Sequence, residues 1–194
     1  MNIAIITARG GSKRIPHKNR KEFCGKPIIE YSIQAALGAG VFDTVMVSTD
    51  DEKIAQIARA AGAEVPFMRS KKTSNDYAAT ADVLLEVLEQ YDKMGQHFIH
   101  ACCIYPTAPF VTSEKLKQAM EILQKEERYS VMPVTAFSFP PLRGMVQHEG
   151  KITYKWPEYA MKRSQDLEVQ DIDNETDWEL AEMKYRLLKE KGRL

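Results

Sequence analysis

Short apolar segments alternate along this chain with segments whose apolar residues recur at helical spacing. The apolar segments predict β-strands at 2–7, 43–49, 64–66, 97–105 and 130–134. The helical spacing predicts helices at 27–37, 50–61, 76–94 and 113–126. Strands that alternate with helices of these lengths form a mostly parallel sheet covered on both faces, so we expect a three-layer α/β/α fold.

The length, charge balance and cysteine content of the chain narrow the classes of protein to which it can belong. Its 194 residues fit a single domain, 1–194. The 27 basic residues balance the 27 acidic ones, which argues against a nucleic-acid partner. No apolar run reaches the roughly 18 residues of a membrane span, so we expect no membrane partner. The three cysteines form no CxxC pair and favour a reducing compartment, so we expect a cytoplasmic protein.

The segment after the first predicted strand carries a concentration of positive charge. Residues 9–26 include seven basic residues and one acid, Glu22. The adjacent Gly10 and Gly11 let backbone N–H groups approach a ligand, and Arg9 can bind a phosphate through two hydrogen bonds. Because ligands bind beyond the carboxyl ends of parallel strands, we interpret the segment as a polyphosphate-binding loop, with a flexible basic surface loop as the alternative. It matches neither GxxxxGK[ST] nor GxGxxG, which argues against ordinary ATPases and dinucleotide oxidoreductases.

Two acids near the C-terminus, Asp171 and Asp173, close a segment at 169–173 that is typical of a strand end. Carboxylates two residues apart on a strand share a face. Such a pair suits a partly hydrated Mg²⁺ that also contacts substrate phosphates, and a pair that merely faces water is the alternative.

Two further segments suit a substrate. The turn at 105–110 can present backbone amides and Thr107, although most such turns only connect elements. The segment 161–166 offers a cation and an amide that suit a carboxylate and hydroxyl groups, and a solvated charged stretch is the alternative.

The alternation of strands and helices stops after Thr135. Residues 144–157 predict a hairpin-like excursion with Gly150 at its turn, and Trp156 is among the apolar residues that it exposes. We therefore expect this excursion to be an exposed arm that contacts a second copy of the chain. A final helix follows, with the spacing of a capping box at Thr176 and Glu179.

Four of these segments together resemble the acylneuraminate cytidylyltransferase family. They are Ile5–Asn19, Val47–Asp50, Tyr105–Pro109 and Asp171–Asp173, and they occur in the family's order over nearly the whole chain. Within the family the chain is most similar to the branch that activates pseudaminic acid, because Tyr105 stands where sialic-acid members carry Gln.

The resemblance implies a Rossmann-like nucleotidyltransferase fold and a Mg²⁺-dependent reaction in which CTP and a nonulosonic acid, most of all pseudaminic acid, give a CMP-sugar and pyrophosphate. It also implies that the arm at 137–163 makes a homodimer. Sialic acid or another keto-sugar acid is the alternative acceptor. A nucleotide-binding protein that an internal deletion has inactivated is a further alternative.

The resemblance also implies roles for individual residues. It assigns nucleotide binding to Ala8, Arg9, Gly10, Gly11, Ser12, Lys13, Lys18, Asn19, Arg69 and Thr80. It assigns the sugar site to Tyr105, Thr107, Arg163 and Gln165. It assigns Mg²⁺ to Asp171 and Asp173, and the catalytic set to Arg9, Lys13, Lys18 and Asp173.

The sequence departs from the family's pattern near 168–169. Family members carry a further segment with an aromatic strand between the Arg-x-Gln-Asp motif and Asp-x-Asp, whereas here Gln165 is followed almost directly by 169–173. Either the chain is shortened internally or residues are left out of the sequence. Because a missing core strand would leave sheet edges uncovered, we favour the second interpretation.

Overall fold

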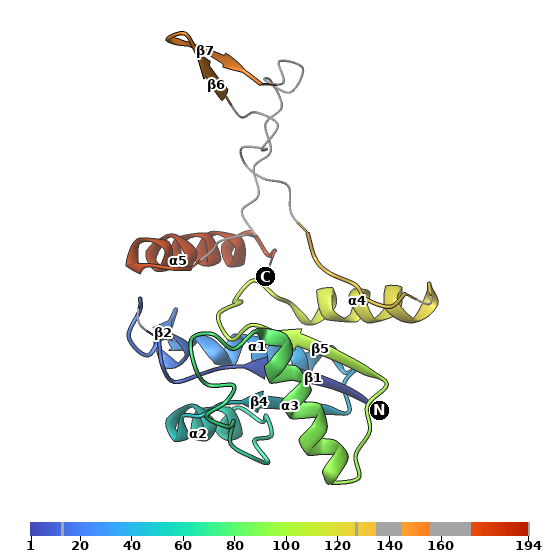
Figure 1. Cartoon of the computed structure of the whole chain (residues 1–194). Coiled ribbons are helices and arrows are strands. Elements are labelled where there is room, and N and C mark those ends of the chain that lie inside the picture. The colour runs from blue at the N-terminus through green and yellow to red at the C-terminus, as the bar shows by residue number, and fades with distance from the viewer. Residues whose placement is uncertain (13, 127, 135–144, 156–171, 194) are drawn as a thin grey trace.

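A parallel three-stranded sheet forms the centre of the computed structural model, which describes residues 1–12, 14–126, 128–134, 145–155 and 172–193 (Figure 1). The strands are β1 (Asn2–Thr7), β4 (Thr44–Ser48) and β5 (His100–Ile104), in the order β4-β1-β5. In this register Ile5 lies opposite Met46 on one side and Cys103 on the other. Residues 3–6 of β1 are fully buried, as expected for the central strand of a sheet covered on both faces.

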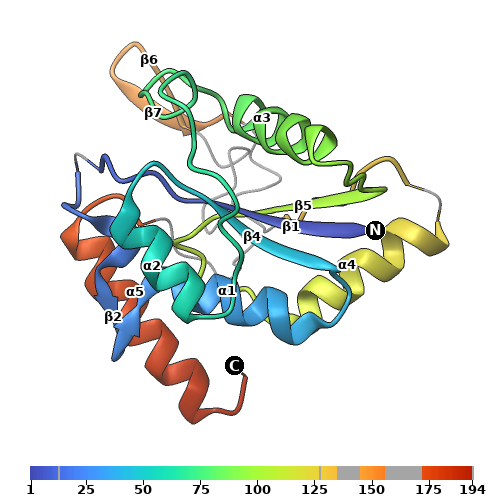
Figure 2. The same cartoon turned by 90° about the horizontal axis from the view of Figure 1, so that it is seen from below.

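Helices cover both faces of the sheet (Figure 2). On one face lie α1 (Ile28–Ala39), α2 (Glu52–Ala60) and α4 (Ser113–Lys125), which pack through Ile33, Ile54 and Leu116 onto the alternate β1 residues Ala4 and Ile6. On the other face α3 (Thr80–Lys93) packs onto the remaining β1 residues. The structure therefore confirms the predicted three-layer α/β/α fold. None of its helices, within the described residues, is long and apolar enough to cross a membrane.

The C-terminal helix α5 (Glu175–Glu190) packs outside these layers against α1 and against Phe23 of a small antiparallel pair, β2 (Glu22–Phe23) and β3 (Lys26–Pro27). The contact is aromatic: Phe23 meets Trp178 edge-on, with ring centroids 5.5 Å apart. The predicted capping box at Thr176 and Glu179 is wrong by two residues. Asn174 accepts a hydrogen bond from the Asp177 N–H at 2.9 Å, and Asp177 accepts one from the Asn174 N–H at 3.1 Å. Asn is preferred over Thr at this position.

Other predicted boundaries differ from the structure. Residues 130–134 form no strand, and Met132 and Val134 are 79% and 91% exposed; Pro133 has no N–H to donate to a sheet. The predicted strand at 64–66 is reduced to one parallel bridge between Met46 and Glu64. Ile172 and Asp173 lie in irregular chain, whereas 169–171 lie outside the described residues.

The predicted hairpin is present as β6 (Met145–His148) and β7 (Lys151–Tyr154), which pair antiparallel. Its two-residue turn has positive φ at Glu149 (47°) and Gly150 (75°), as a tight hairpin turn requires. The remainder of the predicted arm, 137–144 and 156–163, lies outside the described residues. The contact with a second copy therefore stays a prediction.

Candidate functional site

A cleft of about 500 Å³ opens at the carboxyl ends of β1 and β5. Three segments form most of its lining: the loop after β1, which we call the N-terminal loop (8–19), the loop that precedes α3, which we call the middle loop (69–79), and the turn after β5. The described side chains that line it include four cations and one carboxylate: Arg9, Arg14, Lys18, Arg69 and Asp76. This charge suits a ligand with several negative charges.

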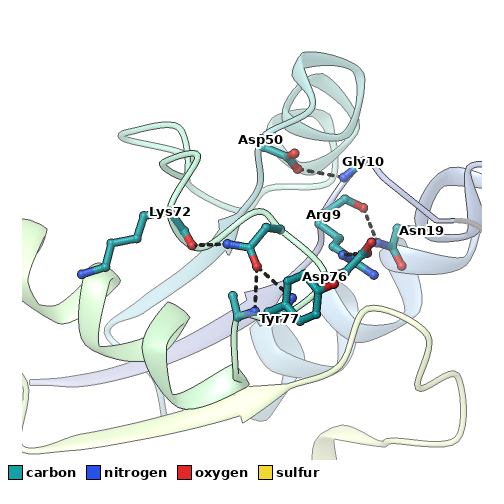
Figure 3. A network of polar contacts seen from close by, with 9 residues as sticks. Arg9, Gly10, Asn19, Asp50, Lys72, Asp76 and Tyr77 are labelled. Atoms are coloured by element: carbon teal, nitrogen blue, oxygen red, sulfur yellow. Dashed lines mark hydrogen bonds and ion pairs between the residues drawn. The ribbon is translucent and has the colours of Figure 1, made fainter.

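The start of the N-terminal loop is fixed to β4 and to the residue pair that follows it, Asp50 and Asp51. Ala8 N–H donates to the Ser48 carbonyl at 2.9 Å, and Gly10 N–H donates to Asp50 Oδ1 at 2.8 Å (Figure 3). A Cβ at Gly10 would lie 2.8 Å from the Cβ of Asp51, so this close approach requires glycine. The Gly10 N–H, which we expected to face a ligand, is already paired, whereas Gly11 lines the cleft.

Arg9 contacts residues of both loops. The Asn19 side-chain amide donates to the Arg9 carbonyl at 2.8 Å, from the short helix η1 (Lys18–Arg20). The Arg9 guanidinium forms an ion pair with Asp76 of the middle loop, with 2.6 Å between Nη1 and Oδ1 (Figure 3). Ser12 also lines the cleft. Arg9, Ser12 and Asn19 therefore lie together at the cleft, and their role in nucleotide binding stays a prediction.

The middle loop is held by Glu86, which lies on α3. Glu86 accepts hydrogen bonds from the Ser70 N–H (2.8 Å), from the Ser70 hydroxyl (2.9 Å) and from the Thr73 hydroxyl. Desolvation, the largest single influence, raises the pKa of Glu86, but the hydrogen bonds from Thr73 and Ser70 outweigh it and lower that pKa overall.

An Asx turn delays the start of α3. Asn75 Oδ1 accepts hydrogen bonds from the N–H groups of Tyr77 (2.8 Å) and Ala78 (3.0 Å). Such side-chain bonds compete with the helix, so α3 begins at Thr80 rather than at the predicted residue 76. The turn leaves Asp76 on the cleft.

Arg69 is a buried cation at the cleft, with only 8% of its surface exposed. Its Nε donates to Ser48 Oγ at 3.0 Å and its Nη2 to the Ser48 carbonyl at 2.5 Å. Burial lowers the pKa of this guanidinium, and the charge of Asp50 opposes that shift. The two hydrogen bonds fix the guanidinium at the end of β4, in the region where we expected it to contact the nucleotide.

The far end of the N-terminal loop is joined to the residues before α5. Arg14 forms an ion pair with Asp173, with 2.6 Å between Nη1 and Oδ2. Lys18 Nζ donates to the Ile172 carbonyl, and Lys21 pairs with Glu175. The structure thus places Asp173 beside the cationic loop. The described residues contain no group of three His, Cys, Asp or Glu side chains that could hold a metal ion.

The turn after β5 brings the predicted sugar-site residues to the same cleft. Tyr105 and Thr107 line it, and the Tyr105 hydroxyl lies 3.4 Å from Thr80 Oγ1. The Ser32 hydroxyl donates to the Tyr105 carbonyl at 2.8 Å and anchors the turn on α1.

Four predicted site residues lie outside the described residues: Lys13, Arg163, Gln165 and Asp171. The sequence analysis missed Asp76, Glu86 and the Arg14–Asp173 pair. Asp76 lies 67 residues from Arg9, and no spacing in the sequence indicates such a contact.

Comparisons with known proteins show what this chain is similar to. The pseudaminic acid cytidylyltransferase of Campylobacter jejuni serotype O:2 is 43% identical over 167 residues, which are 86% of this chain and 72% of that protein. The CMP-N,N'-diacetyllegionaminic acid synthase of Legionella pneumophila is 36% identical over 139 residues, 72% of this chain and 60% of that one.

A solved structure is similar in fold as well. It is a CMP:2-keto-3-deoxy-manno-octonic acid synthetase complexed with CTP, at a TM-score of 0.55 and 25% identity. The similarity covers 65% of this chain and only 48% of the synthetase. Residues 3–155 match the protein family described as Cytidylyltransferase. With the match extending over most of its length, this chain belongs to the cytidylyltransferase family.

Proposed function

We propose that this chain transfers the cytidylyl group of CTP to a nonulosonic acid, with pseudaminic acid as the preferred acceptor. The observation that carries the proposal is the cleft at the end of β1, where cations from both loops meet the turn that holds Tyr105. The 43% identity to a pseudaminic acid cytidylyltransferase supports the choice of acceptor.

The nucleotide would bind along the N-terminal loop. Arg9, Arg69 and Lys18 supply positive charge for the triphosphate, and Ser12 and Asn19 supply hydrogen-bonding groups. Phosphoryl transfer depends mainly on positioning and on neutralising the charge of the leaving group. A cleft lined by fixed cations meets both needs.

The acceptor would bind beside the triphosphate, against Tyr105 and Thr107, with Arg163 and Gln165 as further contacts. The anomeric hydroxyl oxygen attacks the α-phosphorus, and the bond from the α-phosphorus to the α,β-bridging oxygen breaks. Pyrophosphate leaves, and the hydroxyl proton passes to solvent or to a base. The products are the CMP-sugar and pyrophosphate.

Magnesium is part of the proposal. Asp173 offers carboxylate oxygens, the ligand type that Mg²⁺ prefers, and its ion pair with Arg14 places it beside a cleft suited to phosphates. We assign the ion to Asp173 together with Asp171 and the substrate phosphates. When bound, Mg²⁺ would neutralise charge on the triphosphate, and Arg14 would release Asp173 to admit it.

Two further parts of the proposal concern the protein as a whole. The β6–β7 hairpin exposes Val146 (41%) and Ile152 (65%), which supports a homodimer formed through the arm at 137–163.

The three cysteines are free, which suits the reducing cytoplasm.

A panel of acceptors tests the proposal. The purified chain is supplied with CTP, Mg²⁺ and one sugar acid at a time: pseudaminic, sialic, legionaminic or 3-deoxy-manno-octulosonic acid. Pyrophosphate release is followed, and the CMP-sugar is identified by mass spectrometry. We expect the highest kcat/KM with pseudaminic acid. Release with sialic acid alone would refute the acceptor, and CTP binding without release for any acid would favour an inactivated nucleotide-binding protein.

A further inference from the structure

A carboxylate faces the cleft that we assign to a triphosphate, and the proposed function gives it no role. We propose that Asp76 is an internal counter-ion, which competes with the substrate phosphates for Arg9 and thereby limits the affinity for CTP. This inference rests on the proposed function for the identity of the ligand.

The geometry of the pair supports competition. Arg9 Nη1 lies 2.6 Å from Asp76 Oδ1, and both side chains line the cleft. The two side chains are 37% and 41% exposed, so a ligand can reach the pair from the cleft. Asp76 is the acidic residue among the described side chains that line the cleft. A phosphate that binds Arg9 through Nη1 would therefore compete with this carboxylate.

The position of this carboxylate is built into the middle loop. Asn75 accepts hydrogen bonds from the two N–H groups that follow Asp76, and its side-chain amide donates to the Lys72 carbonyl at 2.6 Å (Figure 3). Glu86 holds the start of the same loop through Ser70 and Thr73. These hydrogen bonds hold the backbone around Asp76 in place, so its contact with Arg9 is not a chance contact on a flexible surface.

The strength of the pair suits a competitor that substrate can displace. A partly exposed ion pair contributes little, in affinity terms about two- to fivefold. A triphosphate carries more negative charge than one carboxylate and therefore displaces Asp76 from Arg9. An uncharged nucleoside does not compete for Arg9. The pair therefore weakens binding of CTP without weakening binding of cytidine.

Calorimetric titration of the full chain with CTP and with cytidine tests the inference. We expect Asp76→Asn to bind CTP about two- to fivefold more tightly than the wild type and cytidine equally well. Asp76→Ser provides a second replacement with the same expectation. Glu121→Gln removes a carboxylate from an ion pair on α4, away from the cleft, and is expected to bind CTP as the wild type does.

A double-mutant cycle separates competition from general repulsion. In an Arg9→Ala background we expect the gain from Asp76→Asn to shrink towards none, because competition needs both partners. A gain that persists in full in that background overturns the inference, and so does a wild-type chain that binds CTP as tightly as Asp76→Asn or more tightly. A wild-type chain that binds no CTP refutes the proposed function itself.

Discussion

The two loops that meet at the Arg9–Asp76 pair are held in place by different kinds of contact. The N-terminal loop begins with a backbone hydrogen bond from Ala8 to the Ser48 carbonyl of β4, and Gly10 makes a close approach to Asp51 that only glycine allows. The middle loop also begins with a backbone hydrogen bond, from Arg69 to the Thr49 carbonyl, but the rest of it is held by side chains, chiefly Glu86 and Asn75. We therefore expect the N-terminal loop to be sensitive to a carbon atom added at Gly10, and the middle loop to be sensitive to protonation of Glu86.

The largest expected effect concerns the cation that the N-terminal loop contributes. Arg9→Ala removes a charge-assisted contact to phosphate, so CTP should bind more weakly by about 1.5–3 kcal/mol, or at least tenfold. Calorimetry measures the change. Arg128→Ala removes a more exposed arginine that pairs with Glu126, outside the cleft, and serves as the control. Equal affinities for the two variants would remove Arg9 from the site.

Two neighbouring glycines test how the N-terminal loop is fixed. Gly10→Ala forces its Cβ against Asp51, which caps α2, and should lower the free energy of unfolding by about 1–3 kcal/mol. Gly11→Ala is the matched control, because a Cβ there meets nothing within 4 Å. Chemical denaturation compares them. Equal stabilities would show that the close approach does not constrain the loop.

The anchoring of the N-terminal loop at α5 gives a smaller effect. Asn174→Ala removes the cap that follows the Arg14–Asp173 contact, and should cost about 1 kcal/mol of the free energy of unfolding. Thr176→Ala, at the position favoured by the sequence pattern, should change it by less than about 0.5 kcal/mol. The reverse ranking in urea denaturation would restore the predicted capping box.

The last expected effect is of similar size and tests the middle loop by its dependence on pH. Because the folded pKa of Glu86 is below its unfolded value of about 4.3, its contribution to stability is present above that value. It is lost as the pH falls through the lower, folded pKa. Glu86→Gln should cost about 0.5–1.5 kcal/mol at pH 7 and show a shallower loss of stability in acid. Denaturation curves for both chains at several pH values measure this, and parallel pH profiles would contradict it.

Much of the fold could be predicted because its signals are local in sequence. The buried run of β1 and the helical spacing before Gly40 specify their elements directly. The same reasoning failed at 130–134, where a strand-like composition has no neighbouring strand to pair with in the described sheet. A strand requires a partner, and the sequence of one segment does not show whether a partner is available.

The candidate site also contains residues that the sequence indicates and contacts that it does not. Arg9, Ser12 and Asn19 follow β1 directly, and their place at the end of the sheet follows from strand order. Asp76 and Glu86 act through contacts made only after the chain folds, and the same holds for the pair between Asp173 and Arg14, which lie 159 positions apart. Such long-range pairs between charged residues leave no periodic pattern in the sequence.

A crystal structure of the chain with CTP and Mg²⁺ tests the central claim most directly. We predict the triphosphate in the cleft at the end of β1, with a phosphate oxygen on the Arg9 guanidinium in place of the Asp76 carboxylate. CTP bound elsewhere, with the Arg9–Asp76 pair intact, would contradict the account.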